Sequence, residues 1–548
     1  MLLEYGLINI RSSEMSYREY NQEQTDIFGL DINARIPEHH LVRFVNDLIE
    51  NMDLTKLHAQ YSPEGSPAYN PKMMLKIIVY AYMNGIYTCR KIAKAVRENI
   101  NFIWLTGDQQ PDFRTINTFA WTRCKDVLAE VFCKVVLMAE EKGYLELDSC
   151  FIDGTTLRAN AGKNSYIWKK SALRYQEQVK TRVDNLFCRI KKLNEEEQLQ
   201  YGDQDLREVG TQLEFLNELN VEEAEPEEIA QAVEKAQSEL QKAVDTLKTH
   251  LPSNAPAIKN INHLLSELNK IQKLDVPKLE KYDQQIEIIG KDRNSASKTD
   301  NDATFIRMKD SLLAPGYVSS ISTSNQFVTA VHLYNVPREA VEYTTLMDIH
   351  YTSLGTYPKQ VIGDAAYGIA VNLDYTHKKK IVSYLKPPDY KRDYWDSLLP
   401  GFVYEETKDQ WVCPNGKTLT LDNEEVVRAN GPERTVKSYR CEDCQDCPFV
   451  QKCIPYKNKS GKNLVYDPYL SPLRQETVHN LQSKEGKKLM KKRCIEPEAV
   501  FASIKWNSKF SRFTVRSLSK CKNQLLLVLL GHNIQKFYNA SMATMTGT

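Results

Sequence analysis

The sequence predicts a mixed α/β protein with an all-α N-terminal domain, a helical insertion and a small cysteine-rich insertion. Three patterns support this fold class: helical spacing of apolar residues through residues 15–144, strand-like segments alternating with helical ones from residue 145 onward, and a coiled-coil period within residues 170–299. The chain has 548 residues, about three or four times the usual length of one domain, so several compact units are expected.

Composition excludes the membrane and secreted classes of protein. Hydrophobic residues make up 42% and charged residues 26% of the chain, which is ordinary for a soluble globular protein. The longest apolar run, residues 525–530, is far shorter than the ~20 residues that a membrane-spanning helix needs. Residues 1–4 lack the charged region followed by an apolar stretch that marks a secretory signal. We therefore expect a cytoplasmic protein without a membrane partner.

The N-terminal domain contains three predicted helices in sequence. Pro71 suits the first turn of a helix that ends at the Asn-Gly pair of residues 84–85. Thr88 is a good N-cap for a basic helix over residues 89–99, and Asp112 is one for a third helix. This order resembles a helix-turn-helix DNA-binding module, although a plain three-helix bundle has the same pattern. The candidate DNA contacts of the module are Arg90, Arg114 and Asn117.

From residue 145 the pattern changes to one typical of strands. Residues 147–159 predict a β-hairpin that turns at the Gly-Thr pair of residues 154–155. Residues 317–334 predict two more strands joined by a turn at the Ser-Asn pair of residues 324–325. The remaining elements of this part are a helix over residues 339–354 and strands over residues 360–363 and 380–385. Strands and helices in this order predict a mixed sheet.

Between residues 168 and 289 the helical period returns at coiled-coil spacing. Apolar stripes occupy residues 179–193, 229–251 and 261–271, and Pro226 opens the second of the three helices. The stripes are core positions, so this insertion is expected to form a helical hairpin or a small bundle.

Three acidic residues occupy positions that suggest a shared site. Asp153 closes an apolar strand, and Asp364 follows the short strand before it. Taken alone, each of these acids would more often cap a turn than project from the rim of the sheet onto a metal. Glu498 changes the interpretation, because a helix starting near Pro497 would place Glu498 and Lys505 on one face.

The formal net charge of +1 hides a basic block near the C-terminus. Residues 456–522 hold sixteen Lys and Arg against five Asp and Glu, a balance typical of surfaces that face phosphates. A solvated surface has the same composition. Aromatic and apolar residues interleave with the charges in residues 505–513, however, which favours a packed element that faces DNA.

Five motifs together carry a family resemblance. They are FIDGTTLRAN at residues 151–160, DATFIRMK at 302–309, GDAAYG at 363–368, the stretch 493–505, and FSRFTVR at 510–516. With these motifs the chain resembles the DDE transposases of bacterial insertion sequences, in the subgroup with a helical N-terminal module and a cysteine-bearing insertion before the last acid. The similarity starts near Met15, so residues 1–14 are interpreted as a possible extension.

The resemblance implies an RNase H-like, retroviral-integrase-like catalytic core with Asp153, Asp364 and Glu498 as its acidic triad. Three converging carboxylates require a cation, and their hard oxygen ligands suit two Mg²⁺ or Mn²⁺ ions. Family members carry a tyrosine-arginine-glutamate-lysine signature around the last acid. Lys505 matches its lysine, but the arginine position holds Cys494, with Arg493 one place earlier, and the tyrosine position holds Lys491. Glu496 is the competing candidate for the last acid.

Five of the twelve cysteines lie between residues 413 and 453, in the pattern Cys-Pro and then Cys-x2-Cys-x2-Cys-x5-Cys. Such paired thiolates are typical of a closed structural zinc site in a reducing cytoplasm. Five candidates compete for four places. The resemblance favours Cys413, Cys444, Cys447 and Cys453 as the ligands, with Cys441 as the spare residue.

As a transposase, the protein would bind the terminal inverted repeats of its element and target DNA, and would carry out metal-dependent cleavage and strand transfer (cut-and-paste transposition). A homodimer or larger assembly on DNA is expected, in association with the bacterial nucleoid. The candidate phosphate contacts in the basic block are Lys505, Arg493, Lys509, Arg512 and Arg516. Two alternatives stay open: an RNase H-like nuclease or resolvase without strand transfer, and a catalytically silent DNA-binding protein.

The expected domain organisation places two insertions within the catalytic core. The expected parts are a possible extension (1–14), a DNA-binding helical domain (15–144), the catalytic core (145–169, 300–410 and 466–548), the helical insertion (170–299) and the zinc insertion (411–465).

Overall fold

The computed structural model forms two compact units. Unit 1 comprises Met1–Asn160, Ile306–Leu312 and Gly316–Thr548, and unit 2 comprises Ala161–Phe305 and Leu313–Pro315. The residues described are 18, 21–22, 31–61, 67–201, 213, 215–253, 255–338, 340–388, 390, 401–428, 431–441, 444, 446–454 and 461–547. The proposed extension, residues 1–14, and the family-like start at Met15 lie outside the described residues.

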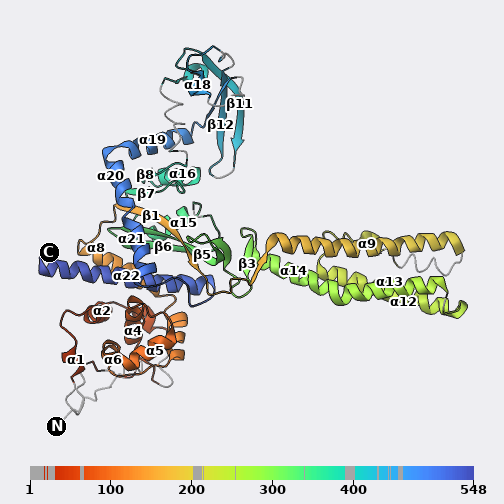
Figure 1. Cartoon of the computed structure of the whole chain (residues 1–548), viewed down its shortest axis with the longest axis horizontal. Helices are drawn as coiled ribbons and strands as arrows, with labels where there is room; N and C mark the ends of the chain where they lie inside the picture. The colour runs from red at the N-terminus through yellow and green to blue at the C-terminus, as the bar shows by residue number, and fades with distance from the viewer. Residues whose placement is uncertain are drawn as a thin grey trace, which may run out of the picture. The chain divides into compact units, whose positions relative to one another are not determined.

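The N-terminal part of unit 1 is helical (Figure 1). Its helices are α1 (Ile32–Arg35), α2 (Leu41–Glu50), α3 (Thr55–His58), α4 (Pro71–Met83), α5 (Cys89–Glu98), α6 (Ile100–Thr106), α7 (Phe113–Thr118), the π-helical turn η1 (Phe119–Arg123) and α8 (Leu128–Glu141). Thr88 accepts a hydrogen bond from the Lys91 amide at the start of α5, and Asp112 accepts one from the Thr115 amide at the start of α7. Both predicted N-caps are therefore confirmed.

Two features of these helices differ from the prediction. The short helix α6 was not expected; it begins where the side chain of Asn99 accepts a hydrogen bond from the Asn101 amide, so a second cap starts a new helix directly after α5. The predicted third helix is also not continuous. It ends at Thr118 and gives way to the π-helical turn η1, because the chain shifts there from the α-helical to the π-helical hydrogen-bond pattern.

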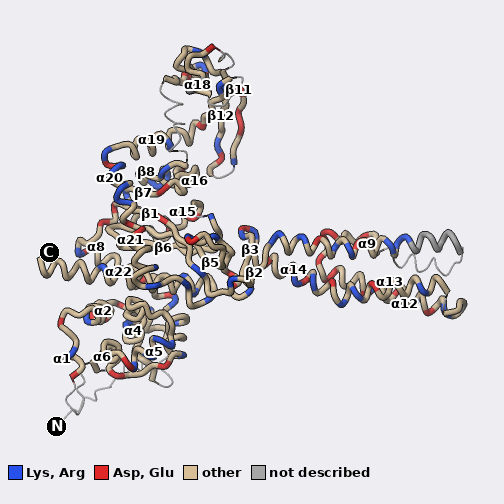
Figure 2. Tube along the Cα trace, viewed as in Figure 1, with Lys and Arg blue, Asp and Glu red and all other residues tan. Residues whose placement is uncertain are grey.

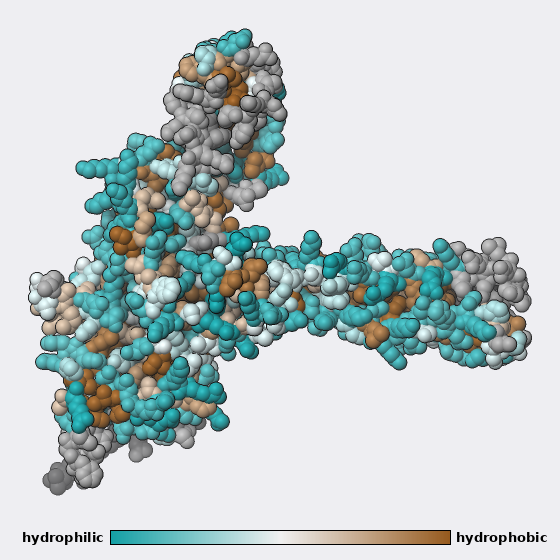
Figure 3. Space-filling view, in the orientation of Figure 1, coloured by the Kyte–Doolittle hydropathy of each residue, from teal (hydrophilic) through white to brown (hydrophobic). Residues whose placement is uncertain are grey.

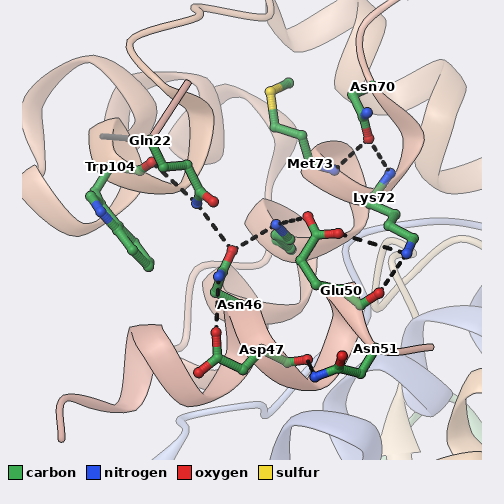
Figure 4. Close-up of polar contacts among 10 residues, drawn as sticks. Gln22, Asn46, Asp47, Glu50, Asn51, Asn70, Lys72, Met73 and Trp104 are labelled. Atoms are coloured by element: carbon green, nitrogen blue, oxygen red, sulfur yellow. Dashed lines mark hydrogen bonds and ion pairs between the residues drawn. The ribbon is translucent and has the colours of Figure 1, made fainter. Parts of the chain in front are cut away.

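A buried lysine, Lys76, joins α2 to α4. Figure 4 labels its partners Asn46 and Glu50 and their neighbours. The Lys76 side chain is fully buried, and its Nζ donates to Asn46 Oδ1 at 2.6 Å and to the Glu50 carboxylate. Asn46 also accepts a hydrogen bond from Gln22, which in turn donates to the carbonyl of Trp104 in α6. Burial lowers the pKa of Lys76, and the Glu50 carboxylate opposes that shift. The network links α2, α4 and α6, and the helices α5 and α7 directly follow α4 and α6 in the chain.

The central sheet of unit 1 is mixed and has the order β4-β5-β1-β7-β8, with β6 also paired to β5. Its strands are β1 (Ser149–Arg158), β4 (Thr304–Arg307), β5 (Leu313–Ser324), β6 (Phe327–Tyr334), β7 (Gln360–Gly363) and β8 (Val382–Leu385). Strand β5 runs antiparallel to β1 and β6, whereas β7 is parallel to β1 and β8 is parallel to β7. This mixed α/β arrangement is consistent with an RNase H-like core.

The predicted hairpin at residues 147–159 is wrong. This segment forms one continuous strand, β1, and Asp153 lies within it instead of closing it. The Asp-Gly pair of residues 153–154 is a local turn signal, but β5 pairs with β1 at every position from Phe151 to Arg158. Continuous ladder pairing with a neighbouring strand therefore overrides the local preference for a turn.

The turn between β5 and β6 lies one residue later than predicted. Asn325 and Gln326 have φ values of 48° and 61°. Both values are positive, as in the type I′ turn that two-residue hairpins favour. Asparagine tolerates this left-handed conformation better than serine does, so the turn includes Asn325 in its first position and excludes Ser324.

Helices complete the layers around the sheet (Figure 1). They are α15 (Tyr343–Leu354), α16 (Ala370–Lys378), α19 (Leu470–Gln482), α20 (Lys484–Arg493), α21 (Glu496–Ala502), the π-helical turn η4 (Ser503–Asn507) and α22 (Leu518–Thr546). Helix α22 packs against α4, α8 and β6, so it joins the N-terminal helices to the sheet. Across the part of the chain that the structure describes, no helix has the length and apolar character needed to cross a bilayer.

Unit 2 is mainly helical, as the apolar stripes predict. Its elements are β2 (Tyr166–Trp168), α9 (Lys169–Tyr201), α11 (Phe215–Glu218), α12 (Pro226–His250), α13 (Pro256–Lys270), the π-helical turn η2 (Ile271–Asp275), α14 (Val276–Ile289) and β3 (Ser295–Ser297). Stripe residues such as Val183, Val233 and Leu264 meet in one buried core. The visible face of these helices is mostly hydrophilic in Figure 3. The coiled-coil geometry itself stays a prediction.

The cysteine-rich part of unit 1 contains a second sheet, which is antiparallel and has the order β13-β12-β11-β10-β9. The elements are β9 (Val403–Glu405), the short helix η3 (Glu406–Lys408), β10 (Gln410–Val412), β11 (Thr418–Val427), β12 (Arg434–Cys441), α18 (Val450–Cys453) and β13 (Lys462–Tyr466). Asp409, which directly precedes β10, links β9 to β12, because it accepts hydrogen bonds from Tyr404, Lys437 and Tyr439. These hydrogen bonds, first among them the one from Lys437, lower the pKa of Asp409 to about 2.

Candidate active site

The first two predicted acids come from neighbouring parallel strands. Strand β1 pairs with β7 in a register that sets Phe151 opposite Ile362. Asp153 follows two residues later within β1, and Asp364 directly follows the end of β7. The charge of Asp364 acts on Asp153, so the two acids lie near each other.

Asp153 is half-buried, and its surroundings change its acidity. Burial raises the pKa of this carboxyl group, and the neighbouring charge of Asp364 raises it further. A hydrogen bond from the Gly154 amide, at 2.9 Å, and the charges of Arg493 and Lys309 act in the opposite direction. A partly desolvated carboxyl group beside a second one is an arrangement that a bound cation would stabilise.

Asp364 begins a tight turn at the end of β7. Its Oδ1 accepts a hydrogen bond from the Ala366 amide at 3.0 Å, and its carbonyl accepts one from the Tyr367 amide at 3.1 Å. The preceding Gly363 is required for packing, because a Cβ atom there would approach Leu385 at 2.8 Å and Ile152 at 3.0 Å. The glycine thus lets the neighbouring strands bring Asp364 up to Asp153.

The two candidates for the last acid have very different surroundings. Both are in the first turn of α21, which packs against β1. Glu496 is 3% exposed and accepts a hydrogen bond from the Gln326 amide at 2.5 Å, so it fixes α21 to the β5–β6 turn. Glu498 is exposed on the same turn of helix. Its exposure leaves Glu498 accessible to a ligand, whereas Glu496 has a structural role.

Lys505 reaches β1 from the π-helical turn η4. Its Nζ donates to Thr155 Oγ1 at 2.5 Å and to the Thr156 carbonyl at 3.4 Å. Burial, together with the charge of Lys309, lowers the pKa of Lys505 to about 8, and the charge of Asp153 opposes this shift. The sequence predicted an ordinary helix here; the structure has a π-helical turn, which is a frequent feature of functional sites.

Two further cations act on Asp153. Arg493, the last residue of α20, lowers the pKa of Asp153 through its charge, and its buried Nε has no hydrogen-bond partner among the described residues. Lys309, in the loop between β4 and β5, acts on Asp153 in the same way. Lys309 was not predicted as a site residue, although it ends the motif at residues 302–309. Figure 2 shows the run of Lys and Arg along α20 that leads to Arg493.

Other predicted phosphate contacts follow β1 beyond Asp153. Arg512 Nε donates to the Ala159 carbonyl at 2.9 Å, and Arg516 Nε donates to the Asn160 carbonyl at 3.1 Å. Both arginines and Lys509 are exposed. Lys505, Arg512 and Arg516 therefore contact residues 155–160 in order, at the end of β1 and just beyond it.

The predicted DNA contacts of the helical domain lie together elsewhere. Arg90, Arg114 and Asn117 line one cavity of about 540 Å³, whose wall also includes Thr514 and Val515. The guanidinium groups of Arg90 and Arg114 lie 5.0 Å and 5.8 Å from the centroid of the Phe113 ring. The cavity joins the start of α5 and α7 to the segment that runs along β1.

Four of the five clustered cysteines are brought together. Burial raises the pKa of the Cys453 thiol, and the charges of Cys444, Cys413 and Cys447 act in the same direction, while Lys462 opposes them. Cys441 is buried at the end of β12, and its carbonyl accepts a hydrogen bond from Cys444 Sγ at 3.6 Å. Over the described ranges, no group of three or more His, Cys, Asp and Glu side chains has the arrangement of a metal site. The zinc and magnesium ligands therefore stay predictions.

Acidic side chains on adjacent parallel strands, surrounded by basic ones, suit an enzyme that acts on nucleic-acid phosphates. Two family models match the chain. One is a transposase domain of the DUF772 type and covers residues 30–120, and the other is a transposase DDE domain and covers residues 412–538. These matches indicate a DDE-type transposase of the insertion-sequence kind, and they confirm the family resemblance. No curated protein and no solved structure matches the chain.

Proposed function

We propose that the protein binds the terminal inverted repeats of its insertion sequence and catalyses metal-dependent strand cleavage and strand transfer. The observation that carries this proposal is that Asp153 lies in β1 and that Asp364, whose charge acts on Asp153, directly follows the neighbouring parallel strand β7. Helix α21, packed against β1, adds the exposed Glu498 to the same region. The sheet supports an RNase H-like core, because β5 is antiparallel to both β1 and β6, whereas β7 is parallel to β1 and β8 is parallel to β7.

The proposed metal ligands are Asp153, Asp364 and Glu498. Carboxylate oxygens are the ligands that Mg²⁺ and Mn²⁺ prefer, and the raised pKa of Asp153 fits a group that a cation would keep ionised. Two such ions would activate a water molecule or a 3′-hydroxyl group and would stabilise the leaving oxygen. The protein's own part is to hold the three carboxylates, and Glu496 helps to fix the helix of Glu498 by accepting a hydrogen bond from the Gln326 amide.

The basic residues along β1 are proposed to position the DNA backbone. Lys505 contacts Thr155, two residues beyond Asp153 on β1, and Arg512 and Arg516 contact Ala159 and Asn160, just after that strand. Contacts of this kind fix the register of the strand and make binding dependent on salt. The cavity lined by Arg90, Arg114 and Asn117 supports a second DNA contact by the helical domain, which would read the element's ends.

The cysteine cluster is proposed to hold one structural zinc ion. Cys453 interacts electrostatically with Cys413, Cys444 and Cys447, which is the set that the sequence favours. Four thiolates suit tetrahedral zinc with no open position, so the ion would stabilise the antiparallel sheet and take no part in the reaction. Cys441, buried against the sheet core, is the spare cysteine of this proposal.

The domain organisation and the assembly on DNA are also proposals. Unit 2 has its own core, which supports the separation of a helical insertion near residues 170–299 from the rest of the chain. Both ends of an element must be cut in one complex, so we propose a homodimer or larger assembly on DNA.

The test uses the full chain and DNA that carries the inverted repeats flanking the open reading frame. Asp153→Ala and Asp364→Asn are expected to abolish cleavage in Mg²⁺ while end binding remains. Asp148→Asn is the matched control, because Asp148 lies just before β1 and pairs with Lys359 on the surface. Precleaved ends joined to target DNA by the wild type would distinguish a transposase from a plain nuclease. Full cleavage by either active-site variant would contradict the proposal.

A further inference from the structure

Three cationic side chains surround Asp153 from three separate parts of the chain. Arg493 ends α20, Lys505 lies in η4, and Lys309 lies in the loop between β4 and β5. The charges of Arg493 and Lys309 act directly on Asp153, and Lys505 is held against the next residues of the same strand. The sequence selected Arg493 and Lys505, but it offered no role for Lys309.

The position of Lys309 is fixed by the loop around it. The Met308 amide donates to the Leu312 carbonyl at 2.8 Å, and the Ser311 amide donates to the Met308 carbonyl at 2.9 Å, so the loop is a closed turn. The Lys309 Nζ lies 5.5 Å from the centroid of the Phe501 ring. Phe501 is three residues after Glu498 on α21, and residues three apart are neighbours on a helix surface. Lys309 is thus directed towards both Asp153 and the helix of Glu498.

These cations lack an acidic partner of their own. Among the described residues, none of the three forms an ion pair with a carboxylate at contact distance. The buried Nε of Arg493 has no acceptor there, although buried donors in proteins are almost always hydrogen-bonded. Lys309 and Lys505 are also close enough for one charge to destabilise the other. Two neighbouring positive charges and a buried N–H group without an acceptor indicate that an anion binds between these three side chains.

We propose that Lys309, Arg493 and Lys505 together bind one phosphate group of the DNA strand at Asp153, with Lys309 as a phosphate-binding residue of the reaction. The inference rests on the proposed function and deepens it, because it names the group that the site grips. A phosphodiester fits this site because the cations come from three separate parts of the chain and a tetrahedral phosphate offers several oxygens to them. Lys309 then contacts the phosphate from beside Phe501 of α21, and Lys505 does so from its contact with β1.

The test compares Lys309→Met and Lys309→Arg with Lys142→Met. Lys142 is an exposed lysine after α8, near the far end of β5, so its removal changes the net charge equally. The probe is a duplex carrying the flanking inverted repeat with a precleaved 3′ end. Its binding is measured in Ca²⁺ over a range of salt concentrations, and its cleavage and joining are measured in Mg²⁺.

Loss of one phosphate contact is expected to reduce the slope of log K against log salt by about 0.9 in Lys309→Met. The same variant should cleave and join about 100- to 1000-fold more slowly, as when one charge-stabilising donor is removed. Lys309→Arg should restore both, and Lys142→Met should match the wild type. An unchanged salt slope and rate in Lys309→Met would overturn the inference. Failure of the wild type to cleave would instead contradict the proposed function, and the salt slope would still test the phosphate contact.

Discussion

DNA binding by this protein is expected to weaken above pH 8 because of one side chain, Lys505. Its pKa of about 8 in the free protein makes it about nine-tenths charged at pH 7 and about one-tenth charged at pH 9. A bound phosphate favours the charged form, so the pKa of Lys505 is higher in the complex. The contact of Lys505 is therefore fully available below pH 8 and is lost progressively as the pH rises through 8. By linkage, affinity at pH 9 should be about tenfold lower than at pH 7, which is about 1.4 kcal/mol.

The assay is fluorescence anisotropy of a labelled duplex carrying the flanking inverted repeat, at constant ionic strength and with a chelator in place of metal. Lys505→Met should bind more weakly at pH 7 and should lose the decline towards pH 9. Lys505→Arg should keep its affinity at pH 9, because a guanidinium group stays charged there. Lys142→Met serves as the charge control and should keep the wild-type decline. If Lys505→Met retained that decline, another group would be responsible and the role given to Lys505 would be wrong.

Two further predictions concern stability and metal content. Glu50→Gln should weaken the helical domain by about 1–3 kcal/mol, because it leaves the buried Lys76 without its carboxylate; hydrogen exchange of the α4 amides measures this, and Glu98→Gln on the surface should change it little. Cys453→Ser should lose zinc and lower the melting temperature of the chain, whereas Cys441→Ser should keep the zinc. Wild-type protein without zinc in elemental analysis would rule out the zinc proposal.

The sequence predicts well those features that local chemistry determines. Thr88 and Asp112 were identified as helix caps because a side-chain oxygen before a helix satisfies amides within the next three residues, and both make that hydrogen bond. The strand before Asp364 was likewise evident from its short apolar run, and β7 occupies those residues. Such features depend on few residues, so tertiary contacts seldom change them.

Features that depend on distant partners were not predictable in the same way. The Asp-Gly pair at residues 153–154 has the local chemistry of a turn, yet pairing with β5 keeps it extended. Lys309 belongs to a loop without periodicity, and its proximity to Asp153 appears only when β4, β5 and β1 are placed side by side. The sequence favoured Glu498 over Glu496 through the family resemblance, but the burial of Glu496 against the β5–β6 turn depends on distant residues and was not predictable.

Unequal strand lengths explain why acids and bases meet at this point of the sheet. Strand β7 ends at Gly363, one residue after its last pairing with β1, while β1 continues to Arg158 with β5 on its other side. Beyond Asp153, the edge of β1 on the side of β7 therefore has no neighbouring strand, and its backbone polar groups need other partners. The C-terminal segment supplies them: Lys505 donates to the Thr156 carbonyl, and the Phe513 amide donates to the Arg158 carbonyl. The early end of β7 thus leaves the carboxylates accessible and also leaves an edge of β1 to which the basic C-terminal segment binds. The position of the site is therefore explained by the shortness of β7.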